Sequence, residues 1–330
     1  MDKYKNSIIK VENLKIYYPA AKRLMEKQRF IKAVDGVNFE VREGEVFGVV
    51  GESGCGKSTL SRGICRLEPV TEGKIFLEGE DITSIHNRKM RPFRKKIQMV
   101  FQDPYSSLDP RMTVFDIIAE PLLEHRLLKN KRELEARVME LLKKVGLDTY
   151  HAYRYPHEFS GGQRQRVGIA RALAVEPRII IADEPVSALD VSIQAQVLNL
   201  LNQLKKDLNL TYIFIAHDLS VVEFISDRIG VMYLGDFVEI GSKEEIYRNP
   251  SHPYTRGLLS SVPIPDPDAP KNHIVMQGTI PSAMNPPSGC KFHTRCASCM
   301  EICTTQVPKR HRTGEDHYVA CHLYDGIKQA

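Results

Sequence analysis

The stretch Gly51-Glu52-Ser53-Gly54-Cys55-Gly56-Lys57-Ser58 decides the fold class of this chain. It follows an apolar run that ends at Val50 and precedes residues suited to the start of a helix. In that order, the backbone N–H groups of a glycine-rich turn can converge on phosphate oxygens at a helix N-terminus. A chance match in a glycine-bearing loop is the alternative, since the motif carries a false-positive risk. We predict an α/β fold with a nucleotide site formed by Gly51, Ser53, Gly54, Cys55, Gly56, Lys57, Ser58 and Thr59.

Two pairs of polar residues have chemical tasks at such a site. Lys57 can reach the β- and γ-phosphates, and the Ser58 hydroxyl can ligate Mg²⁺. A second apolar run, at residues 179–182, ends in Asp183 and Glu184, which is typical of a buried parallel strand that stops at the ligand-binding edge of a sheet. We expect Asp183 to hold Mg²⁺ and Glu184 to orient or deprotonate the attacking water. A solvated turn is the commoner explanation of an isolated Asp-Glu pair, but a phosphate loop requires such carboxylates.

Four further motifs follow the loop along the chain. They are Gln102, Ser160-Gly161-Gly162-Gln163, Ser187-Ala188-Leu189-Asp190 and His217. In this order and at these spacings they resemble the Q-loop, signature, D-loop and switch histidine of the ATP-binding subunits of ABC transporters. The resemblance covers residues 8–245 and continues into the tail. It implies a P-loop NTPase core sheet with an antiparallel β subdomain, a helical signature subdomain and a small cysteine-rich C-terminal extension.

The resemblance also implies a role for each motif. Gln102 is expected to touch Mg²⁺ or the attacking water, and His217 to bridge the γ-phosphate and Glu184. A lone histidine is more often structural, but this one follows a strand that ends at the same sheet edge as Asp183. The signature and D-loop residues are expected to contact the ATP that a partner subunit holds; they are Ser160, Gly161, Gly162, Gln163 and Asp190.

Hydrophobic patterning predicts the elements that carry these motifs. We expect strands at residues 8–16, 33–50, 74–79, 97–100 and 211–216, and helices at residues 59–68, 131–146, 159–173 and 193–208. Tyr18, near the end of the first strand, takes the place where the resemblance implies an aromatic ring stacked on adenine. Tyr17 is the second choice, and an ordinary strand tyrosine is the alternative. The basic stretch at residues 18–30 predicts a solvated loop.

Two segments near the signature have open interpretations. Residues 103–111 are turn-rich, with two prolines and no helical period. The resemblance implies that they meet a short helix of a membrane subunit, and a structural loop is the alternative. We expect Arg164, Arg166 and Arg171 to line one solvated face of a helix, which makes a nucleic-acid site the weaker explanation of these charges.

Bulk properties limit the remaining classes. The chain has 330 residues and a formal net charge of +5, from 46 basic and 41 acidic side chains, which does not argue for nucleic acid. It contains no run of eighteen apolar residues that could span a membrane. Residues 1–5 lack the apolar stretch of a signal peptide. We therefore expect a cytosolic chain whose seven cysteines form no structural disulfides.

The composition changes near Asn249 and divides the chain into two expected domains. Residues 1–249 form the ATPase domain, with the helical subdomain at about 103–172, and residues 250–330 form the extension. Residues 250–287 are rich in proline and predict an extended arm rather than a second core. Five cysteines follow, and their density in a cytosolic chain favours a metal site of Zn²⁺ or iron–sulfur type; they are Cys290, Cys296, Cys299, Cys303 and Cys321.

The tail resembles the C-terminal extension of the ATPases of dipeptide and oligopeptide importers, through residues 287–296 and 319–323. The resemblance implies a [4Fe–4S] cluster on Cys290, Cys296, Cys303 and Cys321, with Cys299 as an extra thiol and a Zn²⁺ site as the runner-up. The long loop after Tyr18 resembles the second of the two ATPases that such importers usually carry. A heterodimer with a homologous ATPase subunit is therefore expected.

Together these features predict an ATPase that drives the uptake of dipeptides or oligopeptides. We expect it at the cytoplasmic face of the inner membrane, as a peripheral subunit on two membrane permeases that receive peptide from an extracytoplasmic binding protein. Nickel, glutathione and oligosaccharide importers share much of this pattern. An ABC ATPase of ribosomes or DNA repair is a weaker alternative, because such chains usually carry two cassettes or a coiled-coil insertion. A regulator without turnover is opposed by Glu184 and His217.

Overall fold

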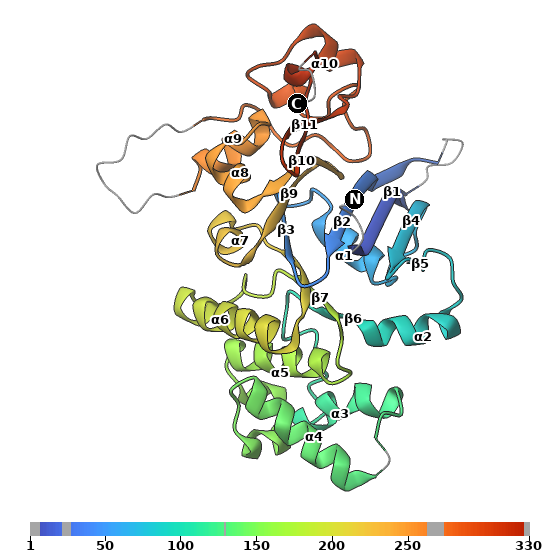
Figure 1. Cartoon of the computed structure of the whole chain (residues 1–330), viewed down its shortest axis with the longest axis vertical. Helices are drawn as coiled ribbons and strands as arrows, with labels where there is room; N and C mark the ends of the chain where they lie inside the picture. The colour runs from blue at the N-terminus through green and yellow to red at the C-terminus, as the bar shows by residue number, and fades with distance from the viewer. Residues whose placement is uncertain (1–6, 22–27, 129, 263–273, 327–330) are drawn as a thin grey trace. The chain divides into compact units, whose positions relative to one another are not determined.

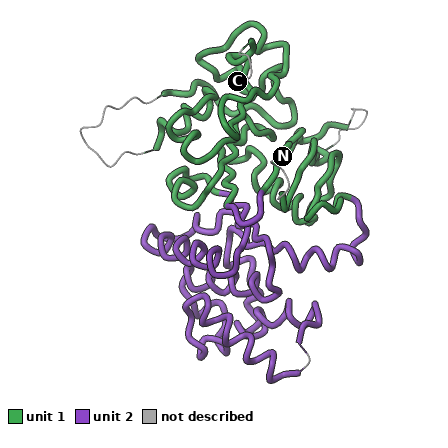
Figure 2. The backbone as a smooth tube through the Cα atoms, in the orientation of Figure 1, with its two compact units in different colours: residues 1–41, 46–83, 216–330 green, residues 42–45, 84–215 purple. Residues whose placement is uncertain are grey.

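The structure is a computed structural model that describes residues 7–21, 28–128, 130–262 and 274–326 (Figure 1). The chain forms two compact units (Figure 2). Unit 1 contains residues 1–41, 46–83 and 216–330, and unit 2 contains residues 42–45 and 84–215. Within the described residues, no helix combines the length and the apolar character needed to cross a bilayer.

Unit 1 contains an antiparallel sheet with the strand order β2-β1-β4-β5. Its strands are β1 (Ser7–Pro19), β2 (Phe30–Arg42), β4 (Glu72–Leu77) and β5 (Glu80–Asp81). β1 and β4 pair with Ile9 opposite Leu77, and both of these side chains are buried. The alternation of buried and partly exposed residues along β1 is the pattern of a strand with one face on a core. This sheet is the antiparallel subdomain that the sequence predicts.

A second set of strands in unit 1 follows the order β11-β12-β10-β9-β3. β3 (Val46–Val50) is wholly buried and runs parallel to β9 (Arg228–Tyr233), as expected for a strand with both faces covered. β10 (Asp236–Ser242), β12 (His317–Ala320) and β11 (Arg310–Gly314) continue it in antiparallel fashion. The helices of unit 1 are α1 (Lys57–Ile64), α7 (Leu219–Ile225), α8 (Lys243–Arg248), α9 (Pro253–Ser260) and α10 (Glu301–Thr305), with 3₁₀ turns η3 (His293–Arg295) and η4 (His322–Tyr324).

Unit 2 contains three parallel strands in the order β8-β7-β6. They are β6 (Ile97–Val100), β7 (Ile179–Asp183) and β8 (Thr211–Ile215). The helices are α2 (Asn87–Lys96), α3 (Val114–Glu124), α4 (Lys131–Lys144), α5 (Gly161–Leu173) and α6 (Val191–Leu208), with 3₁₀ turns η1 (Thr149–Tyr153) and η2 (Pro156–Glu158). Helix α4 buries the leucine and valine stripe that the sequence predicts, and it ends before Gly146, which has a left-handed φ of +70°.

Three expected elements differ from the structure. The single strand expected at residues 33–50 is two strands, because Gly44 turns the chain at a φ of +75°. The helix expected at residues 59–68 spans Lys57–Ile64, since the left-handed Gly56 starts it two residues earlier. The arm expected at residues 250–287 includes α9, whose Tyr254 is fully buried, so this part of the arm is packed. Residues 22–27 of the expected basic loop and the prolines within residues 263–273 lie outside the described residues.

A buried carboxylate on β10 contacts β12, near the C-terminal end of the described residues. Glu239 on β10 is 1% exposed, and its carboxylate accepts hydrogen bonds from the N–H groups of Ser251 (2.6 Å) and His252 (2.9 Å). Its Oε1 also lies 2.7 Å from Nε2 of His317 on β12. Burial opposes ionisation of Glu239, but these partners outweigh burial and hold the pKa of its carboxyl below the ordinary value.

We expect Glu239→Gln to lower the free energy of unfolding by about 3–5 kcal/mol at pH 7, because it removes one member of a buried network and leaves the others unpaired. The pKa of Glu239 is lower in the folded state, so its contribution is complete above the unfolded glutamate pKa and is lost as the pH falls through the folded one. The difference between the wild-type chain and the variant should therefore shrink below about pH 4.3. Urea denaturation of the wild-type chain and the variant, at pH 7 and below about pH 4.3, measures this difference in the free energy of unfolding.

Glu245→Gln is the matched control. The Glu245 carboxylate lies 3.5 Å from Nδ1 of the same histidine, His317, but its side chain is 38% exposed. A partly exposed pair of this kind contributes about 0–1 kcal/mol. A loss in Glu239→Gln no larger than the loss in Glu245→Gln would contradict the role given to the buried carboxylate.

Candidate nucleotide site

Close backbone packing shapes the phosphate loop between β3 and α1. A Cβ atom at Gly51 would lie 2.2 Å from the carbonyl oxygen of Met232, and a Cβ at Gly56 would lie 2.1 Å from that of Ala33. Gly56 also has a left-handed φ of +106° and precedes the first residue of α1. Only glycine fits at these two positions. The loop is therefore fixed at both ends by the backbone that surrounds it.

Hydrogen bonds hold the loop and its lysine. The Lys57 ammonium is buried and donates to the carbonyl oxygens of Gly51 (2.7 Å) and Glu52 (3.1 Å). The N–H of Gly235, in the turn between β9 and β10, donates to the carbonyl of Cys55 at 2.9 Å. Lys57 thus lies along the inner side of the loop, at the N-terminus of α1, where it can exchange these carbonyls for phosphate oxygens.

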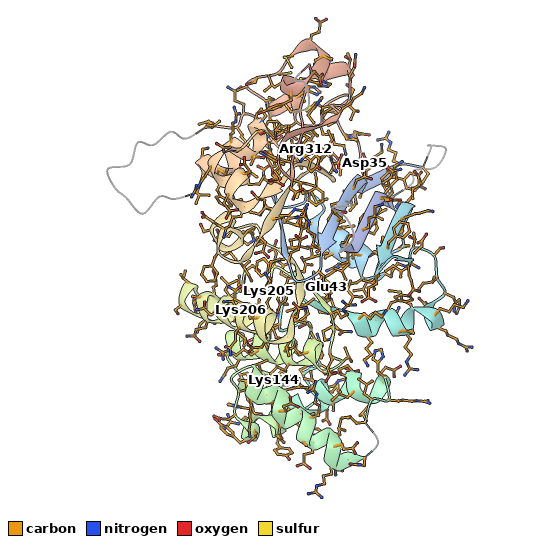
Figure 3. The ribbon with its side chains drawn as sticks, viewed as in Figure 1. Asp35, Glu43, Lys144, Lys205, Lys206 and Arg312 are labelled. Carbon is orange, nitrogen blue, oxygen red and sulfur yellow. The ribbon has the colours of Figure 1, made fainter. Side chains whose placement is uncertain are left out.

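The two tyrosines at the end of β1 face opposite ways, as successive strand residues do. Asp35 on β2 is labelled in Figure 3. The Tyr17 hydroxyl donates to its Oδ1, and the Lys291 ammonium lies 3.0 Å from Oδ2 of the same carboxylate. Burial opposes ionisation of Asp35, but Tyr17 and Lys291 hold the pKa of its carboxyl below the ordinary value. Burial raises the pKa of Tyr18, whose hydroxyl is hydrogen-bonded to Thr59 of α1. Tyr18 is therefore the tyrosine on the side of the phosphate loop.

In unit 2, the predicted catalytic residues meet at the C-terminal ends of the parallel strands. Asp183 is the last residue of β7 and is 2% exposed. The Gln102 amide, just after β6, donates to Oε2 of Glu184 at 3.0 Å. Glu184 has a left-handed φ of +46°, a conformation that costs a non-glycine residue about 1 kcal/mol, and its N–H donates to the carbonyl of Ile215 at 2.9 Å. The chain leaves β7 by this sharp turn, which aims the two consecutive carboxylates differently.

The structure assigns His217 to unit 1, two residues after the end of β8, and its side chain is exposed. The predicted site residues are therefore divided between the units. The phosphate loop, Tyr18 and His217 belong to unit 1, and Gln102, Asp183 and Glu184 belong to unit 2. Gln102 and Glu184, both predicted to be catalytic, are joined by a direct hydrogen bond.

The signature motif forms the start of α5. The Ser160 hydroxyl accepts a hydrogen bond from the N–H of Gln163 (3.3 Å), and the Gln163 side chain accepts one from the N–H of Ser160 (3.0 Å). This capping box leaves the N–H groups of the first turn, at Gly161 and Gly162, aimed outward along the helix axis. A Cβ at Gly162 would lie 2.3 Å from Cγ2 of Ile193 in α6, so this glycine also allows the close approach of the segment after the D-loop. Asp190 is exposed at the N-cap position of α6.

The three arginines after the signature are not on a solvated face, and that expectation was wrong. Arg164 is buried and donates to the carbonyl of Pro156 at 2.6 Å, with its guanidinium 3.6 Å from the centre of the Tyr105 ring. Arg171 donates to the carbonyl of Ser107 at 2.6 Å. Arg166 donates to the carbonyl of Val145 at 3.1 Å. Carbonyl oxygens and an aromatic ring satisfy these charges inside unit 2, which composition alone does not reveal.

The cysteines of the tail gather in one part of unit 1. All five are free thiols; Cys303 and Cys321 are buried, and Cys299 is exposed. The N–H of Cys290 donates to the carbonyl of Cys303 at 2.8 Å. Burial, with smaller contributions from the nearby thiols of Cys303, Cys321 and Cys296, raises the pKa of Cys290 to about 11. Among the residues described, no three His, Cys, Asp or Glu side chains are arranged around a single metal ion.

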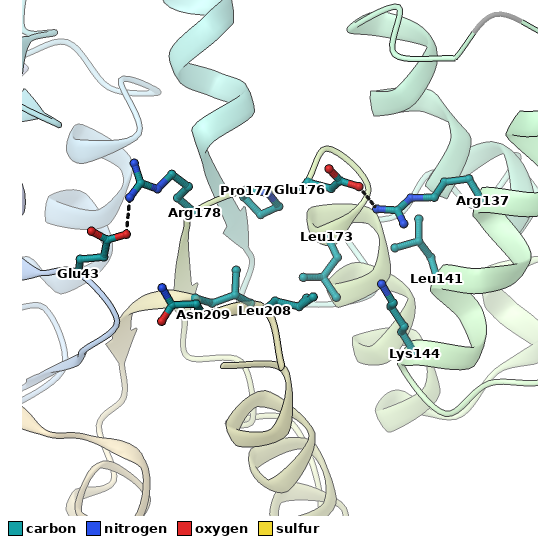
Figure 4. Close-up of a pocket in the computed structure, with 11 residues that line it drawn as sticks. Glu43, Arg137, Leu141, Lys144, Leu173, Glu176, Pro177, Arg178, Leu208 and Asn209 are labelled. Carbon is teal, nitrogen blue, oxygen red and sulfur yellow. Dashed lines mark hydrogen bonds and ion pairs between the residues drawn. The ribbon is translucent and has the colours of Figure 1, made fainter. Parts of the chain in front are cut away.

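A pocket of about 330 Å³ in unit 2 lies away from these residues (Figure 4). Leu141, Leu173 and Leu208 form part of its lining. Two ion pairs flank it: Arg137 with Glu176, at 2.8 Å, and Arg178 with Glu43. It lies at the N-terminal ends of β7 and β8, which is the opposite end of the strands from Asp183. Ligands of open α/β sheets bind at the C-terminal ends, so this pocket is not the nucleotide site.

Two families match this sequence. Residues 34–187 match the ABC transporter family, and residues 238–303 match the oligopeptide/dipeptide transporter C-terminal region. The Oligopeptide transport ATP-binding protein AppF of Bacillus subtilis (strain 168) is 53% identical over 322 residues, which cover 96% of this chain and 98% of AppF. The chain belongs to the ATP-binding subunits of the oligopeptide/dipeptide ABC importers. It is an ABC ATPase, as the sequence motifs predict.

Other similar proteins agree with this assignment. The Oligopeptide transport ATP-binding protein OppF of Escherichia coli (strain K12) is 51% identical over 325 residues, covering 97% of each chain. The solved structure of the ATP-binding cassette MJ0796, a dimer in a post-hydrolysis state bound to ADP and Pi, superposes with a TM-score of 0.64. It is 32% identical and covers 71% of this importer ATPase and 98% of its own chain. The predicted cassette fold is thereby confirmed.

We expect Glu184→Gln to preserve ATP binding and to lower turnover by about 10²–10⁴-fold, because the amide can still accept the Gln102 hydrogen bond but cannot act on water. ATPase assays and nucleotide titration of the assembled importer separate the two effects. Glu176→Gln is the matched control, because Glu176 precedes the other end of β7 and its side chain is 73% exposed. Turnover near the wild-type level in Glu184→Gln would remove Glu184 from the catalytic step.

Proposed function

We propose that this ABC ATPase binds and hydrolyses ATP to drive the uptake of dipeptides or oligopeptides through separate membrane subunits. The observation that supports this most directly is the joint presence of a full set of nucleotide motifs and the peptide-importer C-terminal region in one chain. The similar proteins AppF and OppF are named as oligopeptide transport proteins, and this supports a peptide cargo for this chain.

Each site residue receives a role from its chemistry and its place. Lys57 and the N–H groups of Gly51 and residues 53–59 bind the phosphates, and Tyr18 stacks on adenine. Ser58 and Asp183 offer the hard oxygen ligands that Mg²⁺ prefers. The side-chain oxygen of Gln102 is the third proposed ligand. Glu184 takes the proton of the attacking water, and Gln102 holds the Glu184 carboxylate in place, as their 3.0 Å contact supports. Mg²⁺, when bound, neutralises the phosphate charge that develops during transfer.

The signature acts on the nucleotide of a second ATPase. We propose that the N–H groups of Gly161 and Gly162, together with Ser160, meet the phosphates held by a homologous subunit. The N–H groups of the first turn of α5 point outward from the helix, which supports this proposal. The solved structure of MJ0796 is a dimer, which supports it as well. His217 contacts the γ-phosphate of the ATP that this chain binds. Asp190 contacts the ATP that the homologous subunit binds. ATP favours the closed dimer and shifts its population, and hydrolysis reverses the shift.

Residues 103–111 contact the membrane permease subunits in this proposal. Tyr105 is 65% exposed, so a large aromatic surface is available to a partner. The chain then works as a peripheral subunit at the cytoplasmic face of the inner membrane, and a peptide-binding protein outside the cytoplasm supplies the cargo to the permeases.

The tail cysteines are proposed to hold a [4Fe–4S] cluster. In a cubane each thiolate binds a different iron, so the four sulfurs need not converge on one point. Four free thiols that influence one another, two of them buried, support this proposal, and a Zn²⁺ site is the alternative. Cys290, Cys296, Cys303 and Cys321 would hold the cluster, and the proposed role is structural.

The test of function uses Lys57→Ala. Removing the ammonium should abolish most ATP binding and should stop peptide uptake in cells that depend on this importer, because no other buried cation is described within the loop itself. Nucleotide titration of the purified chain and uptake of a labelled dipeptide measure the two effects. Unchanged nucleotide affinity would remove residues 51–58 from the site, and normal peptide uptake with lost ATP binding would remove peptide transport from the function.

The test of the tail uses protein prepared without oxygen. We expect a brown protein with about four iron and four sulfide per chain. Serine at Cys290, Cys296, Cys303 or Cys321 should lower the iron content and the thermal stability of the tail, while Cys299→Ser, at the exposed thiol, should change neither. Stoichiometric zinc in a colourless preparation would replace the cluster by a Zn²⁺ site, and absence of both metals would contradict the metal role.

A further inference from the structure

Residues of the C-terminal extension form hydrogen bonds with the phosphate loop at Glu52. Glu52 is a loop residue with no assigned part in nucleotide binding. The Glu52 N–H donates to the hydroxyl of Tyr254 on α9 at 2.9 Å. Its carboxylate accepts two hydrogen bonds from the guanidinium of Arg295 on η3, at 2.7 and 3.0 Å. Main chain and side chain of one loop residue are thus held by residues more than 200 positions away in the sequence.

Contacts other than those with the loop also restrict the Arg295 side chain. Its side chain is 6% exposed, and its guanidinium lies 5.9 Å from the centre of the Tyr233 ring. The rings of Tyr233, Tyr254 and Phe292 form a cluster with centres 4.7–5.3 Å apart. A planar guanidinium held in this way presents two parallel donors in one orientation. The pair with Glu52 is therefore rigid rather than a variable surface contact.

Glu52 also helps to position the phosphate-binding lysine, Lys57. The Glu52 carbonyl accepts hydrogen bonds from the Lys57 ammonium (3.1 Å) and from the N–H of Cys55 (3.3 Å). Fixing the N–H and the carboxylate of Glu52 therefore fixes the peptide that supports Lys57 and the turn of the loop. A loop that is ordered before ATP arrives pays less conformational entropy on binding.

We propose that Arg295, together with Tyr254, is a positioning residue of the ATP site, through which the C-terminal extension holds the phosphate loop in the form that binds nucleotide. This rests on the proposed assignment of residues 51–58 as the phosphate loop.

Docking of the extension does not depend on the Arg295 contact. β12 pairs with β10, and His317 on β12 lies 2.7 Å from the buried Glu239. The Arg310 guanidinium on β11 donates to the carbonyl of Asn38 at 2.7 Å, on a strand that precedes the loop. Loss of the Arg295 pair should therefore loosen the loop while the extension stays attached.

The test measures the affinity of the purified full chain for MgATP in a double-mutant cycle. Arg295→Gln and Glu52→Gln should each weaken ATP binding by about tenfold, the scale of a hydrogen-bonded charge pair. The double variant should be no weaker than either single variant, because both remove the same interaction. In the assembled importer, KM for ATP should rise while kcat at saturating ATP stays near the wild-type value. Arg295→Lys should restore part of the affinity.

Arg310→Gln is the matched control, because it removes a contact of the extension that does not involve the loop. Its ATP affinity should equal that of the wild-type chain, and the metal content and the thermal unfolding of every variant should be compared. Wild-type affinity in both Arg295→Gln and Glu52→Gln would overturn the inference, as would an equal loss in Arg310→Gln. If Lys57→Ala abolishes ATP binding while the Arg295 variants keep it, the inference fails and the proposed function stands. Unchanged binding in Lys57→Ala removes the loop assignment itself.

Discussion

The close passage of the phosphate loop between two backbone carbonyls constrains the rest of unit 1. Any side chain at Gly51 or Gly56 would press on the carbonyl of Met232 or of Ala33, so β9, β2 and the loop must keep one spacing. The turn after β9 adds a hydrogen bond from Gly235 to Cys55. Because protein interiors are close-packed, a shift in any of these segments changes the loop, and a nucleotide that orders the loop acts on all of them.

A comparable connection exists in unit 2 between residues 103–111, which we propose contact the permeases, and the signature helix α5. The Tyr105 ring lies against the guanidinium of Arg164, and the Ser107 carbonyl accepts from Arg171, both of which belong to α5. The segment at residues 103–111 is irregular, yet two buried or partly buried arginines tie it to a regular helix. A displacement of this segment would therefore also displace α5, because the contacts of Arg164 and Arg171 join the two.

Much of this organisation could be predicted because it depends on local patterns. Glycine spacing predicts the phosphate loop, and the apolar run before Asp183 predicts β7 and its ligand-binding end. Contacts between distant segments could not be predicted in this way. Tyr254 lies in a proline-rich stretch that suggests an extended arm, but burial against Tyr233 and Phe292 makes it part of a helix that reaches Glu52. The arginines after the signature suggest a solvated face, and only the fold reveals the carbonyls that satisfy them.

The strand β12 comes almost at the end of the chain, and this affects how the protein can be made. Until residues 317–320 have left the ribosome, β10 presents an open strand edge and the Glu239 carboxylate lacks His317. Open edges of this kind can pair with other chains. A chain truncated before β12 therefore leaves the β10 edge open to pairing with other chains, and the pairing of β12 with β10 closes that edge.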